Sequence, residues 1–165
     1  MRYLGRTLLT MCLATASWHA AAQDCVLDVA QFDRQAETLA ARHRGATWDA
    51  QSGFVRWDSK IFGAVAVRIG GCEHFGLTVS AHKPSARRLA QAQVLALAKR
   101  LIVATWPQPY ADDGLKILSG KGQVVRQDAG TTMYDFESPG YVGFFVEHSF
   151  GPTGETITVT AIDAV

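Results

Sequence analysis

The sequence predicts an α+β domain in which two helices pack on an antiparallel β-sheet. Two observations lead to this fold class. Strand-like segments occur in two runs separated by one long apolar segment of helical periodicity, and short turns rather than helices join the strands within each run. Strands joined by short turns pair antiparallel. We therefore expect about six to eight strands, with the longer helix central in the sequence.

Residues 1–22 have the composition of a secretory signal peptide. Basic residues in Met1–Arg6 precede a short uncharged run, Thr7–Ala16, and small residues follow at Ala20–Ala22. The apolar run is too short to span a bilayer, which needs about 20 helical residues. The pattern predicts cleavage after Ala22 and a single domain over residues 23–165 in the periplasm or outside the cell. The alternative is an N-terminal helix that is retained.

The first run of elements begins with a helix over Val29–Arg44. A capping-box pattern at residues 28–31 predicts its start and Gly45 its end. Strands are expected over residues 46–50, 54–58, 61–69 and 72–81, with the last two joined by a two-residue turn at Gly70-Gly71. Alternation in the third of these strands places Ile61 on the same face as Val65, Val67 and Ile69.

The second run follows a long helix predicted over residues 85–105, with Pro84 in its first turn and Pro107 ending it. A short segment over residues 115–118 is an ambiguous strand. Four better strand candidates, separated by Gly- and Pro-containing turns, lie at residues 123–127, 131–137, 141–148 and 156–162.

Cysteine content agrees with export. Cys12 lies in the predicted signal peptide, which leaves Cys25 and Cys72 as the one possible pair. An oxidising compartment favours their disulfide, and chain entropy for a loop of this length indicates about 4 kcal/mol of stabilisation. Two separate thiols are the alternative.

Charge argues against nucleic acid as a partner, and hydropathy argues against a membrane span. Loss of Arg2 and Arg6 with the signal peptide leaves 14 basic and 15 acidic residues, without a basic stripe. Nucleic acid is therefore not an expected partner. The predicted mature chain has no apolar segment of spanning length either, so we expect no membrane span.

Residues that could do chemistry are dispersed along the chain. The sequence has no Gly-x-Ser-x-Gly motif and no clustered Cys/His set. Glu73-His74 and Glu147-His148 are adjacent on predicted strands, so the two side chains of each pair point to opposite faces. We assign no catalytic residue, no metal and no cofactor.

Aromatic residues are the more informative surplus, because some of them would face outward if their strands alternate. They form either a recognition surface or a core covered by helices on both sheet faces. Loops around Lys121 and over Gly151–Glu155 could also insert into a cleft. The candidate partner-binding residues are Trp57, His74, Lys121, Phe144, His148 and Glu155.

These features favour a small periplasmic or secreted protein-binding module. In format alone, with a signal peptide, one short domain, one disulfide and near-neutral charge, the chain resembles inhibitors or immunity proteins that block an envelope-targeting enzyme or toxin. One alternative is a small secreted hydrolase that uses dispersed His, Glu and Asp residues. Another is a carrier of a small apolar ligand held between the long helix and the sheet.

Overall fold

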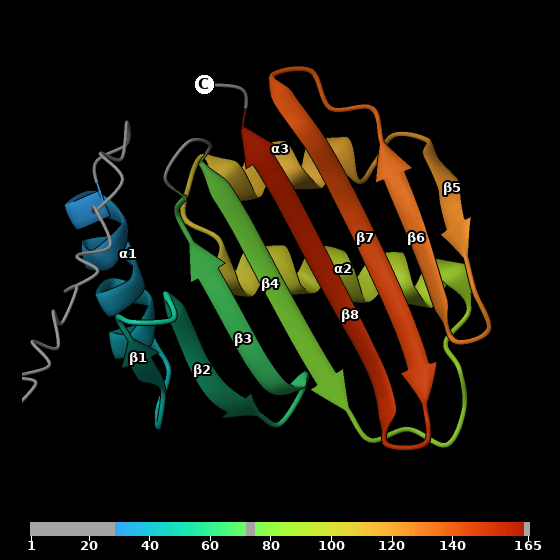
Figure 1. The fold of residues 1–165 in the computed structure, drawn as a ribbon, viewed down its shortest axis with the longest axis horizontal. Helices are drawn as coiled ribbons and strands as arrows, with labels where there is room; N and C mark the ends of the chain where they lie inside the picture. Colours follow the sequence, from blue (N-terminus) through green and yellow to red (C-terminus); the bar gives the residue numbers. More distant parts are fainter. Residues whose placement is uncertain (1–28, 72–74, 164–165) are drawn as a thin grey trace, which may run out of the picture.

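The computed structural model describes residues 29–71 and 75–163, and these residues form an α+β fold with one eight-stranded antiparallel sheet (Figure 1). The fold class predicted from the sequence is confirmed, and the described residues contain three helices rather than two. The elements are α1 Val29–Arg42, β1 Thr47–Asp49, β2 Phe54–Ser59, β3 Gly63–Ile69, β4 Gly76–Lys83, α2 Gln91–Thr105, α3 Tyr110–Ile117, β5 Gly122–Gln127, β6 Thr131–Phe136, β7 Tyr141–Gly151 and β8 Gly154–Asp163. Residues 1–22, Cys25, Cys72 and His74 lie outside the described residues, so the signal peptide and the disulfide stay predictions.

The sheet consists of two four-stranded meanders joined at their last strands. Its order is β1-β2-β3-β4-β8-β7-β6-β5, so β4 and β8 pair at the centre. Val79 lies opposite Val159 in the middle of this central seam. Each meander runs from an edge strand to the central seam, so the two halves of the sheet have the same strand arrangement although the sequence shows no repeat.

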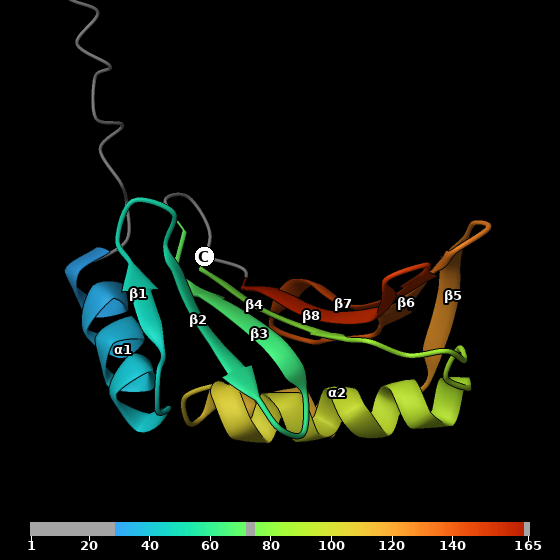
Figure 2. The same cartoon turned by 90° about the horizontal axis from the view of Figure 1, so that it is seen from below.

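All three helices cover the same face of the sheet. On β4, Leu77 and Val79 are buried on this face while Thr78 and Ser80 point away from it. Figure 2 shows α2 lying along the buried face of the sheet, where its Leu101 is fully buried. Helix α1 covers the β2–β3 end of that face, and the core is therefore a single layer between the helices and the sheet.

Helix α2 begins later than the sequence predicted, at Gln91 rather than near residue 85. Upstream, the Ser85 hydroxyl donates to the Arg87 carbonyl at 2.7 Å, which closes a turn. The helix itself is capped by Gln93, whose Oε1 accepts from the Ala90 backbone N–H at 3.0 Å. Local hydrogen bonds therefore hold the Pro84 segment out of the helix.

Helix α3 replaces the ambiguous strand predicted over residues 115–118, and that prediction was wrong. Asp112 and Asp113 lie in its first turn, where carboxylates complement the positive end of the helix dipole. Gly114 is buried against Trp106, and a Cβ at Gly114 would lie 3.0 Å from the indole ring. Close packing therefore favours a glycine at this position of the helix.

Two connections differ from the sequence prediction. Ile61 was expected to share a strand face with Val65, Val67 and Ile69, but the strand begins at Gly63 and Ile61 is 53% exposed. The Ser59 hydroxyl accepts from the backbone N–H groups of Ile61 and Phe62, which builds a turn there. The connection from β3 to β4 is also longer than the predicted two-residue turn, because the Gly70 N–H donates to the Gly76 carbonyl at 2.9 Å.

Tyr141, on β7, makes the free energy of unfolding depend on pH in the alkaline range. Burial raises the pKa of Tyr141 from its ordinary value of 10.0 to about 12, and the Asp113 and Asp163 carboxylates add to the increase. Because the unfolded tyrosine ionises at lower pH, we expect the free energy of unfolding to fall as pH rises from about 10 to about 12. Urea unfolding across this range measures the slope. Tyr141→Phe should reduce the slope, and an unchanged slope would contradict the assignment.

Candidate functional site

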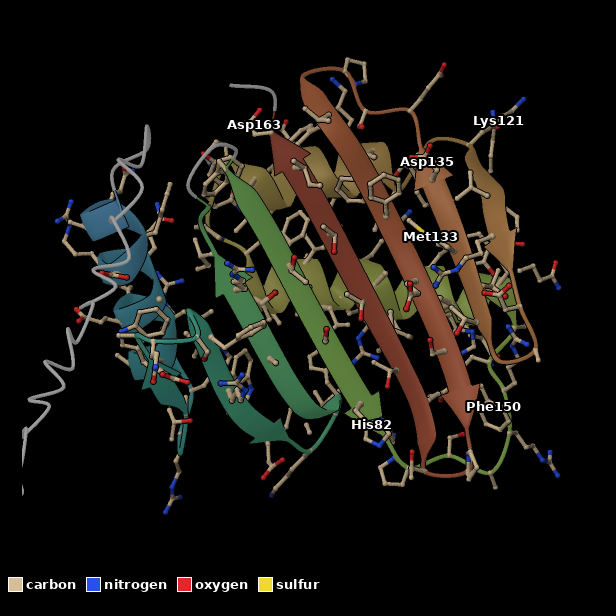
Figure 3. All side chains as sticks on the ribbon, viewed as in Figure 1. His82, Lys121, Met133, Asp135, Phe150 and Asp163 are labelled. Atoms are coloured by element: carbon tan, nitrogen blue, oxygen red, sulfur yellow. The ribbon has the colours of Figure 1, made fainter. Side chains whose placement is uncertain are left out.

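The face of the sheet opposite the helices carries ordered rows of side chains, and no helix of the described residues lies over it. Figure 3 looks onto this open face, with His82 at the end of β4 and with Met133 and Asp135 on β6. The strand register aligns side chains in rows across the sheet. One row contains Arg56, Ala66, Ser80, Thr158, Glu147 and Met133.

Hydroxyl groups line the central seam on the open face. The Ser80 and Thr158 hydroxyls lie 3.0 Å apart, and His82 Nδ1 lies 3.0 Å from the Thr156 hydroxyl. Each pair is a hydrogen bond across the seam. A hydroxyl can donate one bond and accept two, so these groups keep capacity for a further partner. The seam therefore presents a polar surface whose side chains already hold one another in place.

A hollow of about 430 Å³ lies beside this seam over β2, β3 and β4. Its form follows from the strand register. In one row Ala66 lies between Arg56 and Ser80. In the adjacent row Ala64 lies between Asp58 and His82. The two small alanine side chains leave a space that the longer side chains surround.

Arg56 is held at the rim of the hollow by its surroundings on β1 and β2. Its guanidinium lies 4.6 Å from the centre of the Phe54 ring, and its Nη1 lies 3.9 Å from Asp49 Oδ2. Hydrogen bonds from the Ser52 hydroxyl and backbone hold the pKa of Asp49 below its usual range. The hollow thus has a positioned cation at one end, while Asp58 adds a carboxylate that forms no ion pair with any described residue.

In the other half of the open face, over β5, β6 and β7, charged side chains form ion pairs with one another. Arg126 Nη2 donates to Glu147 Oε2 at 3.0 Å, and Arg126 Nε lies 3.3 Å from Asp128. Phe145 and Met133 are half-buried beside this ion pair. This half therefore combines apolar surface with one cation that is paired with two carboxylates.

The structure does not bring the six predicted partner-binding residues together on a surface. Four of them are buried on the helix side, which corrects the expectation that their side chains face outward. Trp57 and Phe144 belong to the core, but the helices of the described residues cover one face of the sheet and not both, as the core interpretation had assumed. Lys121 is exposed next to edge strand β5, and His74 lies outside the described residues. The four buried residues and their exposed fractions are Trp57 8%, Phe144 0%, His148 1% and Glu155 6%.

His148 and Glu155 form a buried pair, with Nε2 and Oε2 3.2 Å apart. Sequence reasoning considered only the adjacent Glu147, which points to the open face. In the β7–β8 hairpin, His148 lies opposite Ile157, two residues beyond Glu155 on the same face. The short turn between Gly151 and Gly154 could have shown this, because it fixes which residues share a face.

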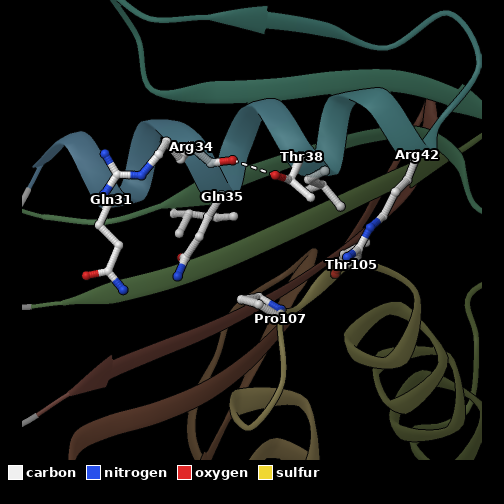
Figure 4. A pocket seen from close by; sticks show the side chains of 9 residues that line it. Gln31, Arg34, Gln35, Thr38, Arg42, Thr105 and Pro107 are labelled. Carbon is white, nitrogen blue, oxygen red and sulfur yellow. Dashed lines mark hydrogen bonds between the residues drawn. The ribbon is translucent and has the colours of Figure 1, made fainter.

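A second cavity, of about 270 Å³, lies on the helix side between α1 and the end of α2 (Figure 4). Sequence reasoning missed it, because it depends on how two helices distant in the chain lie against each other. Its lining residues are Gln31, Arg34, Gln35, Thr38, Leu39, Arg42, Ile69, Thr105 and Pro107.

Within residues 29–71 and 75–163, no group of three or more His, Cys, Asp or Glu residues is arranged to hold a metal ion. The helices of this part of the chain are all too short or too polar to cross a bilayer. Comparison with known proteins adds no relative: no family model, no curated protein and no solved structure matches the chain.

Proposed function

We infer that this chain is a protein-binding module that receives its partner on the open face of the sheet. The observation that supports this function best is the hollow beside the hydroxyl-lined seam, with Arg56 and Asp58 at its rim. In the version that we propose, the chain is exported by cleavage after Ala22 and is closed by the Cys25–Cys72 disulfide. It then acts as an inhibitor or immunity protein against an envelope-targeting enzyme or toxin.

The chemistry of the open face suits a polypeptide better than a polyanion. Basic and acidic side chains alternate on it, whereas a nucleic-acid surface is dominated by basic residues. The seam hydroxyls can exchange hydrogen bonds with backbone or side-chain groups of a partner. Phe145 and Met133 supply apolar area of the kind that anchors protein interfaces.

The size and charges of the hollow indicate which part of the partner would enter it. A protruding loop of the target enzyme fits the available space better than a flat surface. That loop would place a hydrogen-bond acceptor or carboxylate at Arg56 and a donor or cation at Asp58. Because the two charges stand in adjacent rows on the same strand, a loop with one charge of each sign matches them in a single orientation.

Observations on the described histidines favour this function over a hydrolase. The His43 ring stacks on Trp57 with centroids 4.1 Å apart. His82 is bonded to Thr156, and His148 is buried with Glu155. The packing between α2 and the sheet argues against a carrier of an apolar ligand, because Leu101 and Val159 are fully buried there and fill the space such a ligand would occupy.

Filling the hollow tests the proposal. Ala66→Tyr places an aromatic ring on the floor of the hollow without changing charge. The purified wild-type protein and the variant would be immobilised and exposed to envelope extracts. We expect a protein retained by the wild type to bind the variant at least about tenfold more weakly, because the loop can no longer enter.

The matched control is Ala104→Tyr, which makes the same change at an exposed position on α2, on the opposite side of the molecule. Its affinity for the retained protein should equal that of the wild type. Equal retention by Ala66→Tyr, or no protein retained by the wild type, would overturn the open-face assignment.

A further inference from the structure

The cavity between α1 and the end of α2, which we name the α1 cleft, has a form that suits a small ligand. Helix α1 supplies one wall, while Thr105 and Pro107 at the end of α2 supply the other. In Figure 4 the side chains of Gln35 and Arg42 extend from α1 toward Thr105 and Pro107. The floor is apolar, since Leu39 and Ile69 belong to the buried core.

The wall formed by α1 is polar where a helix that faces another element usually carries apolar side chains. Gln35, Thr38 and Arg42 recur at helical spacing along this wall, and the exposed hydroxyl of Thr38 is bonded to the Arg34 carbonyl at 2.7 Å. Thr38 and Arg42 are exposed, so this wall borders solvent and is open to a ligand.

The charge of the α1 cleft is one-sided. Two arginines line it, and none of its described lining residues is an aspartate or glutamate. Arg34 has an interaction of its own, so Arg42 is the cation available to a ligand. Arg42 forms no ion pair with any residue in the described part of the chain. A guanidinium on the wall of a cleft, with its charge uncompensated, favours an anionic group, and its planar fork matches a carboxylate with two parallel hydrogen bonds.

Gln35 adds a specific requirement. Its Oε1 is buried and has no hydrogen-bond partner among the described residues. A buried acceptor without a donor costs about 1–3 kcal/mol. A ligand that brings an N–H group to this oxygen removes that cost, so the site distinguishes ligands with such a donor from simple anions.

We propose that the α1 cleft binds the C-terminal carboxylate of a peptide through Arg42, with a peptide N–H donated to Gln35 Oε1 and an aliphatic side chain on Leu39 and Ile69. The last residues of a peptide combine these three features in one short segment. Gln35 and Arg42 are seven residues apart, about 10 Å along the helix axis, and the long Arg42 side chain shortens the distance that the ligand must span.

This site is separate from the open face, because the α1 cleft lies on the helix side of the sheet. Peptide binding in the α1 cleft does not depend on the partner proposed above. Ala66→Tyr should therefore leave peptide affinity unchanged, so that failure of one proposal can be told apart from failure of the other.

The test is titration of the purified protein with N-acetyl-Ala-Leu, followed through the NMR signals of the Gln35 side-chain amide. A saturable shift with a dissociation constant of about 0.1–1 mM is expected for a ligand of this size. The matched ligand is N-acetyl-Ala-Leu-amide, which has the same shape without the charge. It should bind at least about tenfold more weakly, because the guanidinium loses its anionic partner.

Protein variants assign the contacts. Arg42→Gln should weaken binding of the acid at least about tenfold and make it bind no better than the amide. Arg44→Gln is the control, since Arg44 is exposed just beyond α1 and does not line the α1 cleft. Equal binding of acid and amide to the wild type, full affinity of Arg42→Gln, or no saturable shift up to about 10 mM would overturn the proposal.

Discussion

Phe144→Ala should lower the free energy of unfolding by about 3–5 kcal/mol, one of the largest effects expected from a single substitution in this protein. The Phe144 side chain is fully buried where β7 meets the helices. Its ring makes edge contacts with three others, at centroid distances of 5.9 Å to Trp106, 6.2 Å to Phe136 and 6.5 Å to Tyr141. Truncation leaves a cavity that these rigid rings can only partly fill.

Val142→Ala, two residues earlier on the same strand, is the control for Phe144→Ala. Val142 is 63% exposed, so its truncation removes little buried area and should change stability by less than about 1 kcal/mol. Urea unfolding followed by circular dichroism measures both variants. Similar losses in the two would mean that the aromatic cluster does not hold β7 on the helices.

Glu155→Ala should lower the free energy of unfolding by about 2–4 kcal/mol. Glu155 and His148 are both buried, and their side chains lie 3.2 Å apart. Removal of the carboxylate leaves the imidazole nitrogen inside the protein without its partner. The cost comes from this stranded polar group more than from the attraction that is lost.

Two comparisons isolate the cause of the Glu155 effect. Glu147→Ala removes a carboxylate from the open face of the neighbouring strand, where its partner Arg126 is solvent-exposed, and should cost less than about 1 kcal/mol. Combining Glu155→Met with His148→Leu replaces the pair by apolar side chains and should recover much of the stability lost in Glu155→Ala. An additive loss in the double variant would contradict the stranded-group explanation.

Strands were the most predictable part of this fold, because a sheet covered on one face imposes a strict alternation on the sequence. Val65, Val67 and Ile69 were expected to share one face of their strand, and the structure buries all three. Helix α3 was missed although Asp112 and Asp113 are compatible with a helix start, because Gly114 follows them directly. Its Gly114 is a poor helix former in isolation, and it is accommodated because the Trp106 ring packs where a larger side chain would stand.

The candidate site was less predictable than the fold, because it depends on which strands are neighbours. Nothing in the sequence places Ala66 between Arg56 and Ser80, and this order creates the hollow. Burial of Trp57 depends likewise on α1 lying over β2. Residue types and faces can be derived from the chain, whereas long-range pairing comes only from the three-dimensional structure.

The position of β8 has a consequence for how the molecule folds. It is the last strand of the described sheet in chain order, yet it pairs with both β4 and β7 at the centre. The first meander can form locally as soon as its own residues are available, but its β4 edge stays open until β8 has joined it. Over that interval the folding chain exposes an unpaired strand edge, the kind of surface that chaperones protect and that other chains can join.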